Sequence, residues 1–192
     1  MRSRREVLLG AAVLLSVACS GAQTTGQRRG PITAGDYFPL RTGAAWSYDT
    51  RTGYGGDTVL STLAVVGGEG TSFQVRSGTR TERYERRPDG IVREGDYILR
   101  DPIRAGASWD ARDGGRFEVR ALNLTRRVGE REFRHVIEVV RASPVTRILT
   151  TTWYARDVGV IEIQAETSST VGGATGTIGV RSTLRSYTLG DE

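Results

Sequence analysis

Short runs of β-forming residues, separated by turn signals, are the feature that most constrains the fold of this chain. Such runs follow one another from Trp46 to Leu189, with turn residues roughly every eight to twelve positions. After Gly35, no stretch shows a sustained helical apolar period or a capped helix. The sequence therefore predicts an all-β domain, and the short connections between runs predict antiparallel pairing.

The expected strands set the expected architecture. The favoured arrangement is one strongly curved antiparallel meander sheet, barrel-like or partly closed, and the alternative is a two-sheet β-sandwich. Alternation places Phe133, His135, Ile137 and Val139 on one face, and the small, Gly-rich residues 168–176 are expected to form a mobile loop. The expected strands are residues 46–49, 58–66, 72–76, 81–87, 91–93, 97–99, 117–124, 133–140, 146–155, 160–166 and 178–189.

One local pattern occurs twice. Residues 39–46 (PLRTGAAW) are echoed by residues 102–109 (PIRAGASW), 63 positions later. In each copy the proline suits a strand edge, the glycine can adopt a positive φ in a turn, and the tryptophan then leads a strand. We expect Trp46 and Trp109 to anchor the core rather than to contact a ligand. The flanking residues match poorly, so a true duplication stays open.

The N-terminus reads as an export leader. Residues 1–5 are basic, and residues 7–18 form an apolar run that is too short to cross a bilayer comfortably. The end of this run resembles the lipobox of bacterial lipoproteins, in which a small residue precedes a cysteine that becomes lipidated. The resemblance implies lipidation of Cys19, although Ser16 stands where that motif usually has Leu. The alternative is an ordinary signal peptide cleaved near Ala18 and Cys19.

The export route and the destination follow from neighbouring residues. Residues 3–8 (SRREVL) resemble a twin-arginine signal, and a Sec signal is the alternative. By resemblance to lipoproteins of diderm bacteria, Ser20 favours the outer membrane over the inner membrane. Residues 20–34 are polar, Gly-rich and without periodicity. We therefore expect a signal peptide over residues 1–18, a lipidated cysteine and flexible tether over 19–35, and one all-β domain over 36–192.

Composition excludes several function classes. The formal net charge is +5, and part of it lies in the leader, so nucleic-acid binding is not indicated. Every basic side chain is arginine, which excludes lysine-based chemistry. The single cysteine allows no internal disulfide, and with only one histidine, His135, no Cys- or His-rich metal site is expected.

Two stretches carry a family resemblance. Residues 37–48 contain YFPL-x2-G-x2-W-x-Y, and residues 153–161 contain WYA-x2-VG followed by aliphatic residues. Together they resemble a set of uncharacterised bacterial envelope lipoproteins. The resemblance implies an envelope location and a β-fold, and it implies no reaction, cofactor or catalytic residue. We interpret Trp153 and Tyr154 as the end of a strand in a hairpin that locks the sheet.

No catalytic constellation is recognisable. His135 has no partner that spacing selects, and the GGATG run at 172–176 lacks the context and the lysine of a phosphate loop. We expect a non-enzymatic protein without cofactor or metal, anchored to the membrane, with a structural or interaction role toward an envelope partner. The alternative is a carrier or sensor that holds an apolar, lipid-like ligand in the curved sheet, and an envelope enzyme ranks last. Candidate structural or binding aromatics are Trp46, Trp109, Trp153 and Tyr154.

Overall fold

The chain divides into two compact units, Met1–Gly30 and Pro31–Glu192. The computed structural model describes residues 31–53, 56–171 and 174–190, and within these it describes residues 168–171 and 174–176 by their backbone alone. The described residues all belong to the second unit. The expected signal peptide and the expected lipidation site Cys19 lie outside the described residues.

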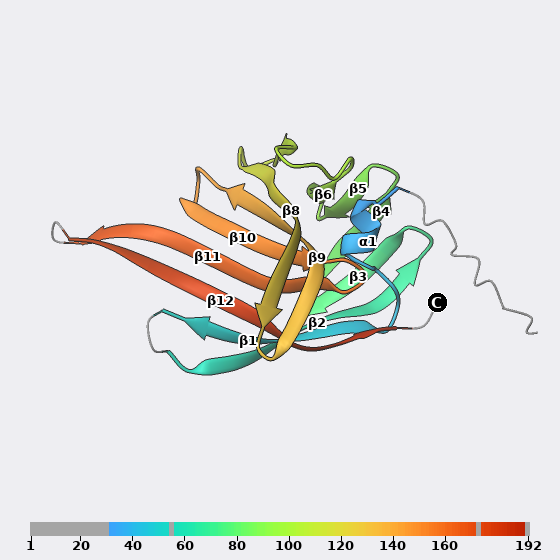
Figure 1. Cartoon of the computed structure of the whole chain (residues 1–192), viewed down its shortest axis with the longest axis horizontal. Coiled ribbons are helices and arrows are strands. Elements are labelled where there is room, and N and C mark those ends of the chain that lie inside the picture. The colour runs from blue at the N-terminus through green and yellow to red at the C-terminus, as the bar shows by residue number, and fades with distance from the viewer. Residues whose placement is uncertain (1–30, 54–55, 172–173, 191–192) are drawn as a thin grey trace, which may run out of the picture. The chain divides into compact units, whose positions relative to one another are not determined.

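The described strands form a single twelve-stranded antiparallel sheet (Figure 1). Each strand pairs with its neighbours in sequence, except that β6 and β7 do not pair, and β1 pairs with β12. This confirms the all-β meander and shows one curved sheet in place of the alternative two-sheet sandwich. The strands are β1 (Ala44–Thr52), β2 (Thr58–Glu69), β3 (Ser72–Ser77), β4 (Arg80–Arg87), β5 (Gly90–Arg93), β6 (Asp96–Arg100), β7 (Ser108–Asp110), β8 (Arg116–Val128), β9 (Arg131–Ala142), β10 (Ile148–Ala155), β11 (Gly159–Val171) and β12 (Ala174–Leu189).

The two edge strands, β6 and β7, meet at a seam that side chains bridge. Indole Nε1 of Trp109 donates to the carbonyl oxygen of Tyr97 at 2.8 Å, and the backbone N–H of Arg112 donates to Oδ1 of Asp96 at 3.0 Å. The Trp109 ring also stacks on Phe117 with centroids 5.4 Å apart. The sheet is therefore nearly closed, barrel-like, with one seam that no backbone ladder joins.

The repeated sequence pattern forms the same turn twice. Gly43 and Gly106 have φ angles of +83° and +77°, which glycine adopts without the Cβ clash of other residues. The backbone N–H of the alanine after each glycine donates to the carbonyl oxygen of an arginine, Ala44 to Arg41 at 3.0 Å and Ala107 to Arg104 at 3.1 Å. The expected sequence of turn and tryptophan-led strand is confirmed. The settings differ, because β1 is paired on both sides whereas β7 is an edge strand.

A single turn of helix, α1 (Ala34–Tyr37), precedes β1. Its first residue Ala34 is fully buried and donates its backbone N–H to Asp101 at 2.9 Å. Ala34 therefore packs as part of the second unit. Across the described ranges, no helix combines the length and the apolarity needed to cross a membrane.

The long β8–β9 hairpin departs from simple alternation. Asn123 and His135 have φ angles of +53°, and the β8–β9 register shifts at Ala121/Leu124. The expected common face of Phe133, His135, Ile137 and Val139 is wrong: His135 is exposed, and pairing with Arg126 and Leu124 places Phe133 on the same face as the fully buried Val136. The positive φ at His135 shifts the alternation by one residue.

The loop expected at residues 168–176 is also corrected. β11 continues to Val171 and β12 begins at Ala174, and their pairing extends to the couple Val171↔Ala174. Small polar and glycine side chains do not prevent a strand when its backbone is paired with a neighbour in register. Figure 1 shows β11 and β12 projecting together well past the shorter strands.

Candidate functional site

A cavity of about 450 Å³ lies inside the curved sheet. Every strand except β7 contributes to its wall, as does Phe38 immediately after α1. This volume falls in the range typical of sites for small molecules. The lining is aromatic (Phe38, Tyr48, Tyr84, Phe117, Tyr154), aliphatic (Leu63, Ile98, Val139, Val160, Ile163), hydroxyl-bearing (Ser61, Thr62, Ser77, Thr150, Thr152, Ser182) and charged (Arg80, Glu82, Arg93, Arg141).

One end of the cavity is closed by packed aromatic rings. Phe38 stacks on Trp46 with centroids 5.5 Å apart, lies 5.7 Å from Tyr84, and meets Tyr154 edge-on at 6.4 Å. All four side chains are buried. Because α1 places Phe38 among rings from β1, β4 and β10, this short helix determines where the cavity ends.

The two stretches that carry the family resemblance meet at this closed end. Nε1 of Trp46 donates to the carbonyl oxygen of Val158 at 2.6 Å, and the Tyr48 hydroxyl donates to that of Val160 at 3.1 Å. Gly159 between them has a φ of +106°, and a Cβ there would lie 3.0 Å from Trp46 Nε1. The expected hairpin turn at residues 157–159 is thus seated directly on the first tryptophan.

The charged lining is predominantly positive, with three arginines and one glutamate. Arg141 is engaged by Asp113 at 2.6 Å, and Arg80 pairs with Glu82 at 3.2 Å. Arg93 lies only within 4.0 Å of Glu82, and 49% of its side-chain surface is exposed. Arg93 also hydrogen-bonds the Tyr84 hydroxyl, so of the three arginines it is the one with the most distant carboxylate partner.

The electrostatics around Arg93 preserve its charge and keep its neighbours neutral. Burial lowers the pKa of Arg93, but Tyr84 and Glu82 raise it by more, so the net shift is upward. Burial raises the pKa of Tyr84 and Tyr154, and Arg93 offsets only part of that rise. At neutral pH this part of the wall therefore offers a guanidinium beside two phenol hydroxyls, all of which can donate hydrogen bonds.

The inner face of the sheet continues beyond the cavity as an open apolar surface. Strand pairing places Val59 opposite Thr50 and Val180 opposite Ala165, on the same face as the lining residue Ile163. Exposed apolar side chains on this face include Val59 at 61% and Ile178 at 56%. Since β1, β2, β11 and β12 outrun the other strands (Figure 1), the cavity opens onto a strip of apolar side chains.

The opposite, outer face holds a buried carboxylate. Glu162 is fully buried and receives hydrogen bonds from Nε of Arg126 and Nε of Arg181, each at 2.7 Å. Arg126 also lies over the Trp153 ring, 3.7 Å from its centroid, while Trp153 Nε1 donates to Glu138. This cluster holds the β8–β9 hairpin against β10–β12, and it is a structural fastening in which each charge already has a partner.

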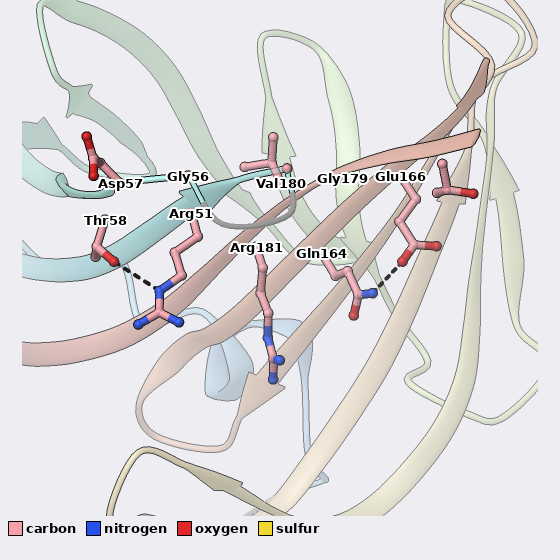
Figure 2. A pocket seen from close by; sticks show the side chains of 11 residues that line it. Arg51, Gly56, Asp57, Thr58, Gln164, Glu166, Gly179, Val180 and Arg181 are labelled. Atoms are coloured by element: carbon pink, nitrogen blue, oxygen red, sulfur yellow. Dashed lines mark hydrogen bonds between the residues drawn. The ribbon is translucent and has the colours of Figure 1, made fainter. Parts of the chain in front are cut away.

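Figure 2 shows a second depression, of about 620 Å³, on the same outer face. Arg51 donates to Thr58 at 2.9 Å, and Gln164 donates to Glu166 at 2.5 Å. Arg181 is already bound to Glu162. Arg51, Gln164 and Arg181 of this depression thus already have partners and few apolar groups line it, so the inner cavity is the stronger candidate for a binding site.

The four candidate aromatics are distributed over different parts of the sheet. Trp46 and Tyr154 both contact Phe38 at the closed end of the cavity, and Tyr154 lines the cavity itself. Trp109 lies at the seam and Trp153 on the outer face. The described residues contain no group of three or more His, Cys, Asp or Glu side chains that could hold a metal ion.

Sequence reasoning missed the residues that give this cavity its polarity. In the charged run at residues 82–87, Glu82 and Tyr84 face the cavity while Arg83 and Glu85 pair on the other side of the strand at 3.0 Å. The tyrosine at the centre of the charged run was the signal that one face is buried. Nothing in the sequence distinguishes Arg93 from the other arginines.

Comparison with known proteins finds remote structural similarity and no sequence match. No protein-family model matches the chain, and no curated protein sequence matches it. Among solved structures, it is similar to a Bacteroides fragilis protein assigned as exported and described as having a YmcC-like fold (TM-score 0.38, 9% identity, 78% of this chain and 99% of that chain). It is also similar to a Parabacteroides distasonis protein assigned as a lipoprotein (TM-score 0.37, 10% identity, 79% and 98%).

Proposed function

We propose that this protein is an exported, lipid-anchored envelope protein whose β-domain is a non-catalytic binding module for a small apolar or amphipathic ligand. The observation that carries the proposal is the cavity of about 450 Å³ inside the sheet. Side chains in a small closed sheet normally fill its interior. Here the inward faces leave room, which favours the carrier or sensor role over a purely structural one.

The chemistry of the lining supports binding rather than catalysis. A general base needs an orienting partner and a nucleophile within hydrogen-bond reach. The cavity wall contains no histidine or cysteine, and its one carboxylate, Glu82, is paired with Arg80. His135 is exposed on β9 and is not among the cavity residues.

The leader supports the anchor and the location. An apolar run that ends at Cys19 suits export and lipidation, and Ser20 favours the outer membrane. Each buried methylene of an acyl chain contributes about 0.8 kcal/mol, so two or more chains give stable attachment. We expect the parent protein to incorporate labelled palmitate and to sediment with membranes, and Cys19→Ser to do neither. If Cys19→Ser took up no palmitate and yet the same fraction of it as of the parent protein sedimented with membranes, the proposed lipid anchor would be contradicted.

Native mass spectrometry of protein purified from membranes tests the binding role. We expect a bound small molecule in a fraction of the parent protein and a smaller bound fraction in Ile163→Trp, whose larger ring would occupy the cavity. Leu60→Trp, at an exposed position outside the cavity wall, is the matched control. Consistent absence of any bound species would contradict the carrier role and leave a structural role toward an envelope partner.

A further inference from the structure

The cavity has a loosely paired cation, Arg93, in its wall, and it opens onto the apolar side chains of Val180 and Ile178. Arg93 projects from β5 into the wall, and its nearest carboxylate oxygen, on Glu82, is 4.0 Å away. A guanidinium has five N–H donors in a planar fork that matches a carboxylate or a phosphate group. Tyr84 accepts one hydrogen bond from this fork and Glu82 is only a loose partner, so the remaining N–H donors can serve a ligand.

The surroundings of Arg93 suit the head of an anionic ligand. Tyr84 lies directly opposite Arg93 in the β4–β5 pairing, and Tyr154 is close enough to interact with its charge. Both tyrosines are buried while Arg93 is half exposed, so a head group at this point would be partly shielded from water. Charge-assisted hydrogen bonds are stronger in such a setting than at an exposed surface.

The rest of the cavity suits an apolar chain. From Tyr154 the wall continues through Val160 and Ile163, and the same face then carries the exposed side chains of Val180 and Ile178. These exposed side chains lie at the open end of the cavity, where β11 and β12 project past the shorter strands (Figure 1). A chain that leaves the cavity by this route would cover apolar surface that is otherwise in contact with water.

We propose, on the basis of the binding role above, that the ligand is a single-chain amphiphile with an anionic head, held with its head at Arg93 and its chain along Ile163 toward Ile178. The net positive lining disfavours a cationic head, and a neutral head would leave Arg93 with only the Glu82 carboxylate, 4.0 Å away, as its counter-charge. Selectivity for the head group comes from charge complementarity with Arg93. The apolar strip adds affinity for the chain and does not distinguish one apolar chain from another.

Calorimetric titration of the full chain carrying Cys19→Ser tests this, because that variant has no acyl chain of its own to compete. The probes are dodecanoate, dodecanol and dodecyltrimethylammonium, each below its micelle concentration. We expect dodecanoate to bind at least tenfold more tightly than the other two. Arg93→Gln should weaken dodecanoate at least tenfold and change dodecanol less than twofold, and Arg93→Lys should recover part of the loss.

Arg83→Gln is the matched control, since Arg83 lies on β4 outside the cavity wall and is exposed. It should bind dodecanoate like the parent, and circular dichroism should show every variant folded. Equal affinity for dodecanoate and dodecanol, or an Arg93→Gln variant with parental affinity, overturns the anionic head while the binding role stands. Absence of binding for all three amphiphiles overturns the binding role itself.

Discussion

At the scale of single residues, the buried polar side chains of Glu162 and Tyr48 avoid an unpaired buried charge in different ways. Glu162 is held between two arginines on the outer face, whereas Tyr48 is a phenol in the core with its hydroxyl bonded to Val160. A buried charge is tolerated only with partners, and a buried phenol avoids ionisation. Substituting either residue should therefore change the stability of the fold more than substituting an exposed polar residue does.

Replacing Glu162 should loosen the β8–β9 hairpin. Glu162→Gln keeps the shape but removes the charge that Arg126 and Arg181 share, so we expect the free energy of unfolding to fall by about 2 kcal/mol. Urea denaturation measures this. Glu118→Gln, exposed on β8, should change the free energy of unfolding by less than about 0.5 kcal/mol. Equal effects of the two substitutions would show that the buried cluster does not stabilise the fold.

The buried tyrosines should make the fold sensitive to alkali. Burial raises the pKa of Tyr37, Tyr48, Tyr84 and Tyr154 above the ordinary value of 10.0. A raised folded-state pKa means that the unfolded chain loses its protons first. The stabilisation is therefore complete below about pH 10 and is lost as the pH rises further. Absorbance at 295 nm should show these phenols ionising only together with unfolding.

A single substitution separates the contribution of one tyrosine. Tyr48→Phe removes the hydrogen bond to Val160, which should cost about 1 kcal/mol at neutral pH. It also removes one titrating group, so the loss of stability above pH 10 should be shallower than in the parent. A parental slope in the variant, measured by urea denaturation at several pH values, would contradict the assignment of that slope to buried tyrosine.

At the scale of elements, the repeated turn and the hairpin at residues 157–159 decide how the sheet is fastened. Trp46 receives the hairpin at the closed end of the cavity, and Trp109 bridges the seam. The same local pattern therefore performs two different structural tasks. The difference comes from the pairing of the strand that each tryptophan leads.

The hairpin should depend on the absence of a side chain at Gly159. Gly159→Ala would place a Cβ 3.0 Å from Trp46 Nε1 at a φ of +106°, so we expect a loss of about 3 kcal/mol and a shift in tryptophan fluorescence. Gly129→Ala is the matched control, because its φ is +59° and no atom lies within 4 Å. It should cost about 1 kcal/mol, from backbone strain alone. Similar losses for both would contradict the role assigned to contact with Trp46.

The seam should open first when Trp109 loses its donor. Trp109→Phe keeps a ring against Phe117 but removes the hydrogen bond to Tyr97, so we expect a loss of about 1 kcal/mol. Amide hydrogen exchange should quicken in β6 and β7 and stay parental in β10 and β11. Unchanged exchange in β6 would show that the seam is held by other contacts.

At the scale of the whole domain, an open interior is the property to test. Ile163→Trp should reduce the cavity and weaken dodecanoate binding at least tenfold while the melting temperature stays within a few degrees of the parent, because Ile163 is only partly buried and has room beside it. Differential scanning calorimetry and titration measure the two effects. Leu60→Trp should alter neither, and a large loss of stability in Ile163→Trp would indicate a filled interior.

The class of fold can be predicted from the amino-acid sequence, because turn residues and period-two alternation are local properties of the chain. The meander order, the turns at Gly43 and Gly106 and the buried tryptophans follow from such local patterns. Local patterns also explain the errors, since pairing with β12 extends β11 through residues that have no strand preference of their own, and a positive φ at His135 reverses the faces of β9.

Where the sheet closes and what it encloses depend on contacts between residues that are far apart in the chain. The cavity joins residues from eleven strands, and Arg93 becomes distinctive only because Tyr84 and Tyr154 lie beside it. The partners of Glu162 come from positions 36 residues before it and 19 residues after it. Such groupings depend on the curvature of a closed sheet, and curvature sums small twists over every strand, so no single stretch of sequence contains it.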